Sequence, residues 1–508
     1  MRLVLLLLLP FPWLYPAALY SEEPAPPVPA APAAAAVPLS LTEAVRLALA
    51  KNFTIEVARY EPLIAQARQV EAGGAFDPVL ASRYTAANGV GTVDSNPLSN
   101  TPPAFYTVKN DTLETSLGGQ LPFGLNYSLV GSVNNQRGSY NSFADSFYTF
   151  GGIRLRQPLL RGLGFGPNLV GIRLARANRA IADAGFRQAV TDTVTRTITV
   201  YNNLFFAQRA YQIAVHSREL AAALLRENRR RLEVGSMSSA DVTIAEARVA
   251  RLVDGVLQAE RDLHDAQNYF RALITSDTHP AVETPLVIEP PLERPAPTLD
   301  KAADLARALA HRPDYQQAQQ NVRRAEVSLA ESRSRVLPQV DLVGSYGYNG
   351  AGTSFDQSYR DARTGNTSSW TAGAELNLPL TLREGRGKYR AAKLTLAQAR
   401  AALGQAEQGI VVEVANAAGQ IETTARRVEA NRQARGLAQQ SLSAEEKRLQ
   451  VGQSNTFTVL QFQELLSYAQ MAEDRAIADF NIALASYDRA IGATLAVHGI
   501  ELTENVRH

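Results

Sequence analysis

Cysteine is absent from the 508 residues of this chain. Its absence excludes disulfide bonds, thiolate metal sites, cysteine nucleophiles and an acylated amino-terminal cysteine. An excess of charge of one sign is missing as well, since 51 Lys and Arg residues stand against 49 Asp and Glu residues. The balanced charge gives no support to a nucleic-acid partner.

Proline is missing from two long stretches, between Pro167 and Pro280 and from Pro379 to the carboxyl terminus. We therefore expect a long helix at 168–233 with a return helix at 237–273, and a second pair at 386–450 and 456–493. The apolar residues of the first long helix recur at the helical period, at Val190, Val194, Ile198, Tyr201 and Phe205.

At roughly 1.5 Å per residue each long helix spans about 100 Å, which no compact soluble domain needs. Alanine dominates the seam of the second long helix, as in Ala391, Ala392, Ala397, Ala399, Ala401 and Ala402. Such small residues suit a tube of many helices as well as a two-stranded coiled coil, so both arrangements remain open.

Long apolar runs are limited to the amino terminus, where Arg2 precedes a leucine-rich segment. Residues 1–21 are typical of a secretory signal peptide, with cleavage near Ala18 to Glu22. A membrane anchor is the weaker interpretation, because prolines interrupt a run already shorter than the ~20 residues of a helical span. Residues 22–39 are rich in Pro and Ala and predict an exported, disordered leader.

The sequence Arg231-Leu-Glu-Val-Gly235 returns as Arg448-Leu-Gln-Val-Gly452. In both copies a basic last turn precedes a glycine that can take the left-handed conformation, which predicts a helix end. Short polar residues follow and can cap the next helix. Ser238 with Asp241 resembles a capping box in the first copy, and Ser454, Asn455 and Thr456 are candidate caps in the second.

The duplicated ends fit two repeats of one plan, each with a helix, strands, a long helix, a tip and a return helix. The first repeat is expected at 40–275, with its opening helix from Leu41 to about Ala72 and strands within 78–157. The second is expected at 299–495, with a helix that begins at Leu299 and strands within 339–380. The proline-rich segment 276–298 is an extended connector, and 496–508 is a short polar tail.

Strand segments alternate apolar and polar residues over about ten positions. Leu113, Leu117 and Leu121 alternate with Glu114, Ser116 and Gln120, and the segments 125–133, 146–157, 340–348 and 370–378 behave alike. A sixth strand is expected after Pro78, where the period changes as it does after Pro338. The pattern is typical of outer-membrane strands with lipid on one side, but it also fits a periplasmic β-sandwich with one wet face.

Six candidate strands cannot close a barrel alone, because the smallest such barrels have eight. Oligomerisation would supply the missing strands and the partners of the overlong helices. The resulting fold class is an internally duplicated α+β membrane protein, with long helical hairpins and transmembrane strands given to a shared barrel.

The sequence gives no sign of an enzyme. The six histidines form no pair at metal-ligand spacing, and neither a phosphate-binding glycine loop nor a Gly-x-Ser-x-Gly motif is present. We expect no catalytic residue, no cofactor and no metal. The acidic pair Glu445-Glu446 is interpreted as part of a solvated helix face.

The chain resembles the TolC-type outer-membrane efflux channels from Leu41 to Leu495. The resemblance rests on the twin Arg-Leu-x-Val-Gly tips, the strand-to-helix junctions at Gln157-Pro158 and Leu378-Pro379, and the repeated helix openings. It implies a homotrimer with an outer-membrane barrel and a periplasmic helical tunnel, without catalysis. It also implies an inner-membrane pump and a periplasmic adaptor as partners, and four strands per protomer, whereas the first repeat here offers an extra hairpin.

The resemblance also implies roles for particular residues. The adaptor would dock at the tips, formed by Arg231, Leu232, Val234, Gly235, Ser236, Arg448, Leu449, Val451, Gly452 and Gln453. Acidic rings that narrow the tunnel would stand six and nine residues after the second glycine, where this chain has Thr458 and Gln461. Asp241 is acidic at the matching place in the first copy, so we expect only weak cation selectivity.

Two other functions compete with small-molecule efflux at this stage. One is the outer-membrane component of a type I protein secretion system, which would use the same conduit. The other is a structural coiled-coil protein of the cell surface, although a stalk has no use for amphipathic strands of membrane-spanning length.

Overall fold

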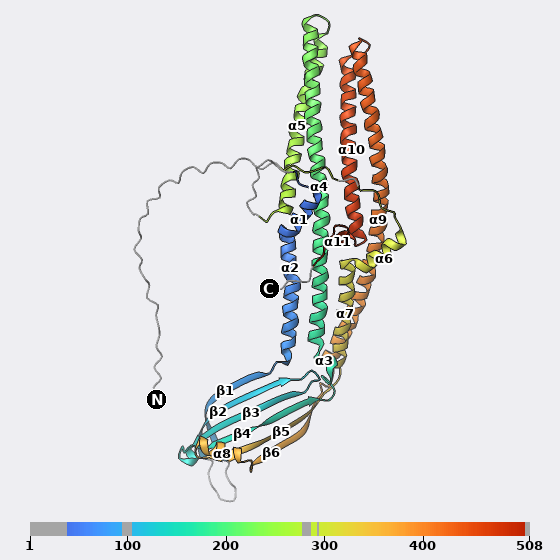
Figure 1. Cartoon of the computed structure of the whole chain (residues 1–508). Coiled ribbons are helices and arrows are strands. Elements are labelled where there is room, and N and C mark those ends of the chain that lie inside the picture. Colours follow the sequence, from blue (N-terminus) through green and yellow to red (C-terminus); the bar gives the residue numbers. More distant parts are fainter. Residues whose placement is uncertain (1–37, 94–103, 277–285, 292–293, 503–508) are drawn as a thin grey trace, which may run out of the picture.

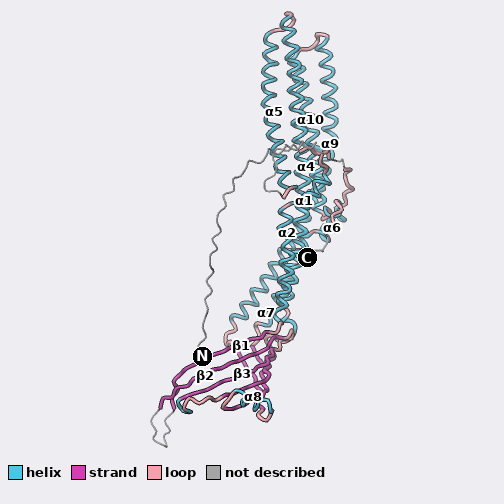
Figure 2. Tube along the Cα trace, turned by 60° about the vertical axis from the view of Figure 1, so that its left-hand side comes forward, coloured by secondary structure: helices cyan, strands magenta, loops and turns pink. Residues whose placement is uncertain are grey.

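The computed structural model describes residues 38–93, 104–276, 286–291 and 294–502. These form a long helical rod with a single β-sheet at one end and two hairpin tips at the other (Figures 1 and 2). The predicted signal peptide at 1–21, and the predicted leader except for its last two residues, lie outside the described residues.

Two helices run the whole length of the rod. These are α4 (Val170–Glu233) and α9 (Arg383–Gln450), with 64 and 68 residues, which at about 1.5 Å per residue gives about 100 Å each. The return helices α5 (Ser239–Ile274) and α10 (Thr456–Ala490) cover the tip half of the rod beside them (Figure 1). The proline-free stretches therefore form the long hairpins predicted for them.

The sheet half of the rod is completed by shorter helices. These are α1 (Leu41–Lys51), α2 (Phe53–Gly73), α6 (Lys301–His311) and α7 (Pro313–Ser334), with the short α3 (Phe165–Asn168) and α11 (Thr494–Val497) beside them.

The prediction of one continuous opening helix in each repeat is wrong, because both helices break, at Asn52 and at Arg312. Asn52 caps α2 through its side chain, which accepts from the amide of Thr54, and its own backbone is extended. Arg312 is extended as well, as a residue before proline prefers to be.

The sheet is an antiparallel meander in the order β1-β2-β3-β4-β5-β6. Its strands are β1 (Val79–Val93), β2 (Ala104–Gln120), β3 (Asn126–Gly138), β4 (Phe147–Pro158), β5 (Gln339–Gly352) and β6 (Ser368–Asn377). The sheet is one layer thick (Figure 1), and no second described sheet covers it, so the β-sandwich interpretation is wrong. A short helix, α8 (Phe355–Thr364), joins β5 to β6 and was not predicted.

The core is a set of small clusters along the rod. One cluster joins Ala417, Ile421 and Leu484 where α9 meets α10, and another packs Tyr201 against Phe270 where α4 meets α5. Alanine is frequent at the helix contacts, as in Ala476, Ala478 and Ala483, which are fully buried. Small side chains let the helix axes approach, which suits a wall of helices one layer thick.

Candidate functional site: hairpin tips, sheet faces and the helix junction

The first tip ends α4 through Gly235, whose φ of +72° lies in the left-handed region. The amide of Gly235 donates to the carbonyl of Leu232 at 2.9 Å, and the amide of Ser236 donates to the carbonyl of Arg231 at 2.8 Å. These two hydrogen bonds define a Schellman motif, which satisfies carbonyls that the helix end would leave free. The side chain of Arg231 pairs with Glu227 one turn earlier, at 3.0 Å.

The second tip repeats this geometry. Gly452 has a φ of +75°, and its amide donates to the carbonyl of Leu449 at 3.2 Å. The amide of Gln453 donates to the carbonyl of Arg448 at 2.8 Å. The predicted role of both glycines as helix ends is confirmed.

The helices after the tips begin at side-chain caps. The hydroxyl of Ser238 accepts from the amide of Asp241 at 3.3 Å and donates to its carboxylate at 2.7 Å. In the second tip the cap is Asn455, whose side-chain oxygen accepts from the amide and the hydroxyl of Thr458, each at 2.9 Å. Asp241 and Thr458 therefore take part in capping.

Apolar side chains project from both tips. Val234 is 78% exposed and Val451 is 70% exposed. Of the neighbouring leucines, Leu232 is exposed, whereas Leu449 is partly buried against a cluster that includes Leu442 and Val459. Each tip thus presents a valine beside a glycine turn at the end of the rod farthest from the sheet (Figure 1).

A buried carboxylate fixes the second tip, contrary to the interpretation of Glu445 as part of a solvated face. Glu445 is 6% exposed, and it accepts hydrogen bonds from Arg448 at 3.1 Å and from the hydroxyl of Ser454. Its neighbour Glu446 is exposed, as expected. The duplicated position in the first hairpin, seven residues before the glycine, is Asn228, and it is buried as well.

The remaining candidate for the tunnel constriction is Gln461, which is exposed on α10 one turn beyond Thr458. Asp241, Thr458 and Gln461 all lie in the first two turns of the helices that follow the tips.

One face of the sheet carries an apolar row that crosses all six strands. Paired positions place Leu80, Leu117, Leu129, Ile153, Tyr346 and Trp370 side by side. Leu80 and Trp370, at the two edges, are each 72% exposed. A soluble protein rarely exposes a continuous apolar surface of this kind, so this apolar face fits contact with lipid.

The opposite, polar face of the sheet carries ion pairs between strands. Arg154 pairs with Glu114 at 3.3 Å, and Arg156 pairs with Asp341 at 2.8 Å and also with Glu375. Asp341 is almost fully buried by its neighbours. A polar face of this kind fits the wall of a water-filled lumen.

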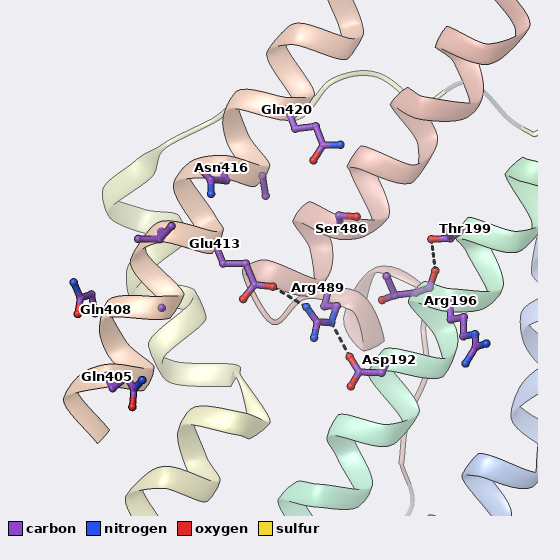
Figure 3. A pocket seen from close by; sticks show the side chains of 14 residues that line it. Asp192, Arg196, Thr199, Gln405, Gln408, Glu413, Asn416, Gln420, Ser486 and Arg489 are labelled. Carbon is purple, nitrogen blue, oxygen red and sulfur yellow. Dashed lines mark hydrogen bonds and ion pairs between the residues drawn. The ribbon is translucent and has the colours of Figure 1, made fainter. Parts of the chain in front are cut away.

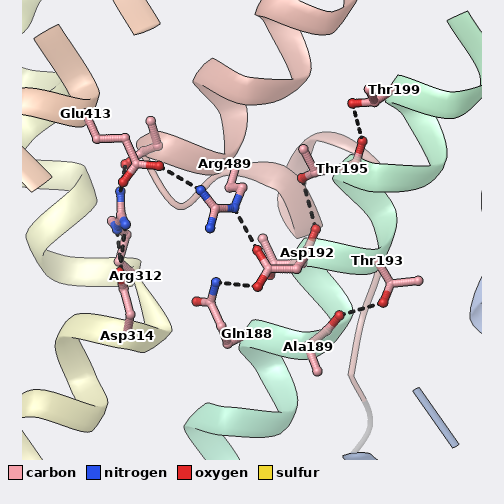
Figure 4. Close-up of polar contacts among 12 residues, drawn as sticks. Gln188, Ala189, Asp192, Thr193, Thr195, Thr199, Arg312, Asp314, Glu413 and Arg489 are labelled. Carbon is pink, nitrogen blue, oxygen red and sulfur yellow. Dashed lines mark hydrogen bonds and ion pairs between the residues drawn. The ribbon is translucent and has the colours of Figure 1, made fainter. Parts of the chain in front are cut away.

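A polar network joins the two repeats where the return helices end. Arg489 of α10 donates to Asp192 of α4 and to Glu413 of α9, both at 2.7 Å (Figure 4). The carboxylate of Glu413 also pairs with Arg312, at 2.7 Å. The network forms part of the lining of a cavity of about 870 Å³ between α4, α9 and α10 (Figure 3).

The two helix breaks contact the ends of the return helices in equivalent ways. The side chain of Asn52 donates to the carbonyl of Leu273 at 3.1 Å, near the end of α5. The guanidinium of Arg312 donates to the carbonyl of Ala490 at 3.1 Å, at the end of α10. The sequence reasoning missed both residues, although the Arg312-Pro313 pair is a helix-boundary signal.

Among the described residues, no group of three or more His, Asp or Glu side chains is placed to bind a metal ion. None of the described helices combines the length and the apolar character of a membrane span.

The comparisons with known proteins agree with this geometry. The chain is similar to the outer membrane efflux protein BepC of Brucella suis biovar 1 (strain 1330), with 27% identity over 366 residues, which are 71% of this chain and 75% of that protein. Its fold is similar to the outer-membrane channels CmeC of Campylobacter jejuni (TM-score 0.67, 15% identity) and MtrE of Neisseria gonorrhoeae (TM-score 0.62, 18% identity). These alignments cover 89% and 90% of this chain and 86% and 89% of those chains.

The model of the outer membrane efflux protein family matches residues 123–276 and 305–493, which together are more than half of the chain. The two matched segments fall in the two repeats. The resemblance noted in the sequence is thereby confirmed, and the stalk interpretation is not supported. This chain belongs to the outer membrane efflux protein family, and it is an outer-membrane efflux channel with a periplasmic helical portion.

Proposed function

We propose that three copies of this chain form a passive conduit whose tips dock a periplasmic adaptor, which joins the channel to an inner-membrane pump. The observation that carries the proposal is the separation of two surfaces. The apolar face of the sheet is at one end of a rod about 100 Å long, and exposed valines on rigid glycine turns are at the other.

The unpaired edges of the sheet support a homotrimer. The first and last strands of the sheet each have one neighbour only among the described strands. Unpaired strand edges and a lipid-facing sheet are incompatible in a membrane, where every backbone group needs a partner. Identical neighbours would pair these edges and extend the helical wall around a common axis.

The tips are suited to dock a helical partner. Val234 and Val451 would enter an apolar groove, and the Schellman turns would hold them in place without a loss of loop entropy on binding. Asp241, Thr458 and Gln461 would line the narrow end of the tunnel. Because two of the three are neutral, we expect weak cation selectivity.

Photo-cross-linking in cells that carry the native pump and adaptor tests the docking. A photoreactive residue is placed at Val234, at Val451 or, as the control, at Leu394, which is exposed on α9 near the sheet. Adducts of channel and adaptor are expected from both tip positions and not from Leu394. Equal adducts from all three positions, or none in cells whose efflux is intact, would overturn the docking at the tips.

The mass of the purified protein in detergent tests the homotrimer. Sedimentation or light scattering is expected to give three chains per particle. A monomeric, folded particle would contradict the shared conduit.

A further inference from the structure

The two repeats give the sheet unequal numbers of strands. The second repeat contributes β5 and β6, whereas the first contributes β1 to β4. The additional hairpin is formed by two long strands, β2 with 17 residues and β3 with 13. Both strands are central in the sheet. β2 pairs with β1 and β3 pairs with β4 over most of their length, and the two strands pair with each other.

The hairpin of β2 and β3 belongs to the same wall as its neighbours. Leu117 and Leu129 continue the apolar row between Leu80 of β1 and Ile153 of β4. On the polar face Glu114 of β2 reaches across β3 to pair with Arg154 of β4. A hairpin folded away from the wall would break the apolar row and separate this ion pair.

The free edges of the sheet are complementary. Strands alternate in direction along the meander, so β1 and β6 run in opposite directions, and β1 of one copy would meet β6 of the next as an antiparallel pair. Neither edge strand contains proline. Each carries exposed apolar residues on the same face, Leu80 and Tyr84 on β1 and Trp370 and Leu376 on β6.

We propose that β1 of each copy pairs with β6 of the next, so that three six-stranded sheets close a barrel of 18 strands. This inference rests on the proposed homotrimer. Barrel diameter grows roughly in proportion to strand number, so the exit is about 1.5 times as wide as that of a barrel with four strands per chain. Barrels of 16 to 18 strands enclose an aqueous channel.

Electron cryo-microscopy of the full-length protein in lipid nanodiscs counts the strands directly. We expect 18 strands in the trimer. A trimer with a 12-stranded barrel, and β2 and β3 outside the wall, would overturn the inference and leave the proposed conduit intact. A particle that is not a trimer would instead contradict the proposed function.

A deletion variant tests how much the hairpin of β2 and β3 adds to the width of the barrel. Removal of residues 104–138 connects β1 to β4, which run in opposite directions, so the remaining four strands keep an antiparallel order. Polymer exclusion measured from the barrel side is expected to show a limiting diameter about 1.5 times larger for the intact chain than for the variant. Equal limits for two conducting trimers would contradict the proposal.

Cross-linking tests the edge pairing even if the deletion variant fails to fold. The chain has no cysteine, so introduced pairs report without background. Ser82→Cys on β1 is combined with Trp370→Cys, Ala372→Cys or Ala374→Cys on β6, positions that share the apolar face. At least one pair is expected to give covalent trimers on oxidation, whereas Leu129→Cys in the central β3 with the same partners is not. Covalent trimers from the β3 control, or none from any β1 pair, would refute the β1–β6 contact.

Discussion

Within the described tips, only Gly235 and Gly452 have a left-handed backbone conformation. At both residues the position that a Cβ would take is open. A Cβ at either residue would meet no atom within 4 Å, so substitution acts through backbone strain alone. Gly235→Ala and Gly452→Ala are expected to destabilise their tips by about 1–2 kcal/mol, the cost of the left-handed conformation for an L-residue. Amide hydrogen exchange of residues 230–240 and 447–458 measures the effect.

Gly404 and Gly436 supply the matched control. Both lie within α9 and also have free space at the Cβ position, but their backbone is helical. Gly404→Ala and Gly436→Ala are expected to stabilise the helix by about 1 kcal/mol. If tip and helix variants shifted exchange in the same direction, the left-handed turns would not be the cause.

The stability of the second tip also depends on Glu445. Glu445→Gln keeps the shape of the side chain but removes its charge, which weakens the hydrogen bonds from Arg448 and Ser454. We expect a loss of about 1–3 kcal/mol in the local opening free energy of the second tip, measured by hydrogen exchange. Glu446→Gln, on the exposed neighbour, is expected to change nothing, and an equal effect of the two variants would contradict this role.

At the scale of single residues, the sequence predicted the features that depend on local backbone conformation. The tip glycines and the cap at Ser238 follow from residue type and order. For the second tip the sequence offered three candidate caps, of which Asn455 is the one observed. The burial of Glu445 could not be predicted, because it depends on Ser454 folding back across the turn and on α10 covering the helix face.

At the scale of elements, the helix break at Arg312 joins three helices. Its guanidinium, 7% exposed, pairs with Asp314 at 2.7 Å and Glu413 at 2.7 Å and caps Ala490. Arg312→Leu leaves these acceptors without their partner. We expect the free energy of unfolding to fall by about 2–3 kcal/mol. This is less than the full cost of a broken buried ion pair, because both carboxylates are partly exposed.

Thermal unfolding in detergent measures this loss against Arg400→Leu. Arg400 pairs with Glu326 at 3.1 Å on an exposed surface, where such pairs contribute about 0–1 kcal/mol. The Arg312 variant is therefore expected to unfold at a clearly lower temperature than the Arg400 variant. Equal unfolding temperatures would show that the break at Arg312 does not organise the junction.

The elements themselves were largely predictable, because long proline-free stretches and strict alternation are strong signals. The alternation of Val340, Leu342, Tyr346 and Tyr348 along one face is confirmed in β5. The helix breaks were not predicted, because the apolar period continues across Asn52 and Arg312. The helix α8 was missed as well, since its packing on the sheet depends on close contact with Gly350 of β5, where a Cβ would clash with the backbone of Ser358.

At the scale of the whole molecule, we expect ion selectivity to be decided at the narrow end proposed for the tunnel. Thr458 and Gln461 are neutral, and Asp241 accepts a hydrogen bond from Ser238. Divalent cations on the periplasmic side are therefore expected not to block single-channel current at micromolar concentrations. Thr458→Asp with Gln461→Asp would add carboxylates around the opening and is expected to create such a block.

The current also depends on how wide the tips are open. The width of the opening is therefore measured in the same channels, with neutral polymers added from the periplasmic side. Block of the unmodified channel by micromolar calcium would contradict the expectation of a weakly selective entrance. A double variant that conducts normally and stays unblocked would show that these positions do not line the opening.

The duplicated plan was readable from the sequence. The proposed homotrimer rests on the same signals, since the rods are too long and the strands too few for one copy. The sequence did not show that the sheet has six strands, because a hairpin with the right alternation can lie in the sheet or beside it. Pairing of β2 and β3 with both neighbours places it in the wall.

Current through a planar lipid bilayer tests the central claim most directly. The purified, full-length trimer, with no nucleotide, pump or adaptor, is expected to insert and give discrete, steady steps of conductance. A folded trimer that inserts into the bilayer and carries no current would contradict the account of this protein as a passive conduit.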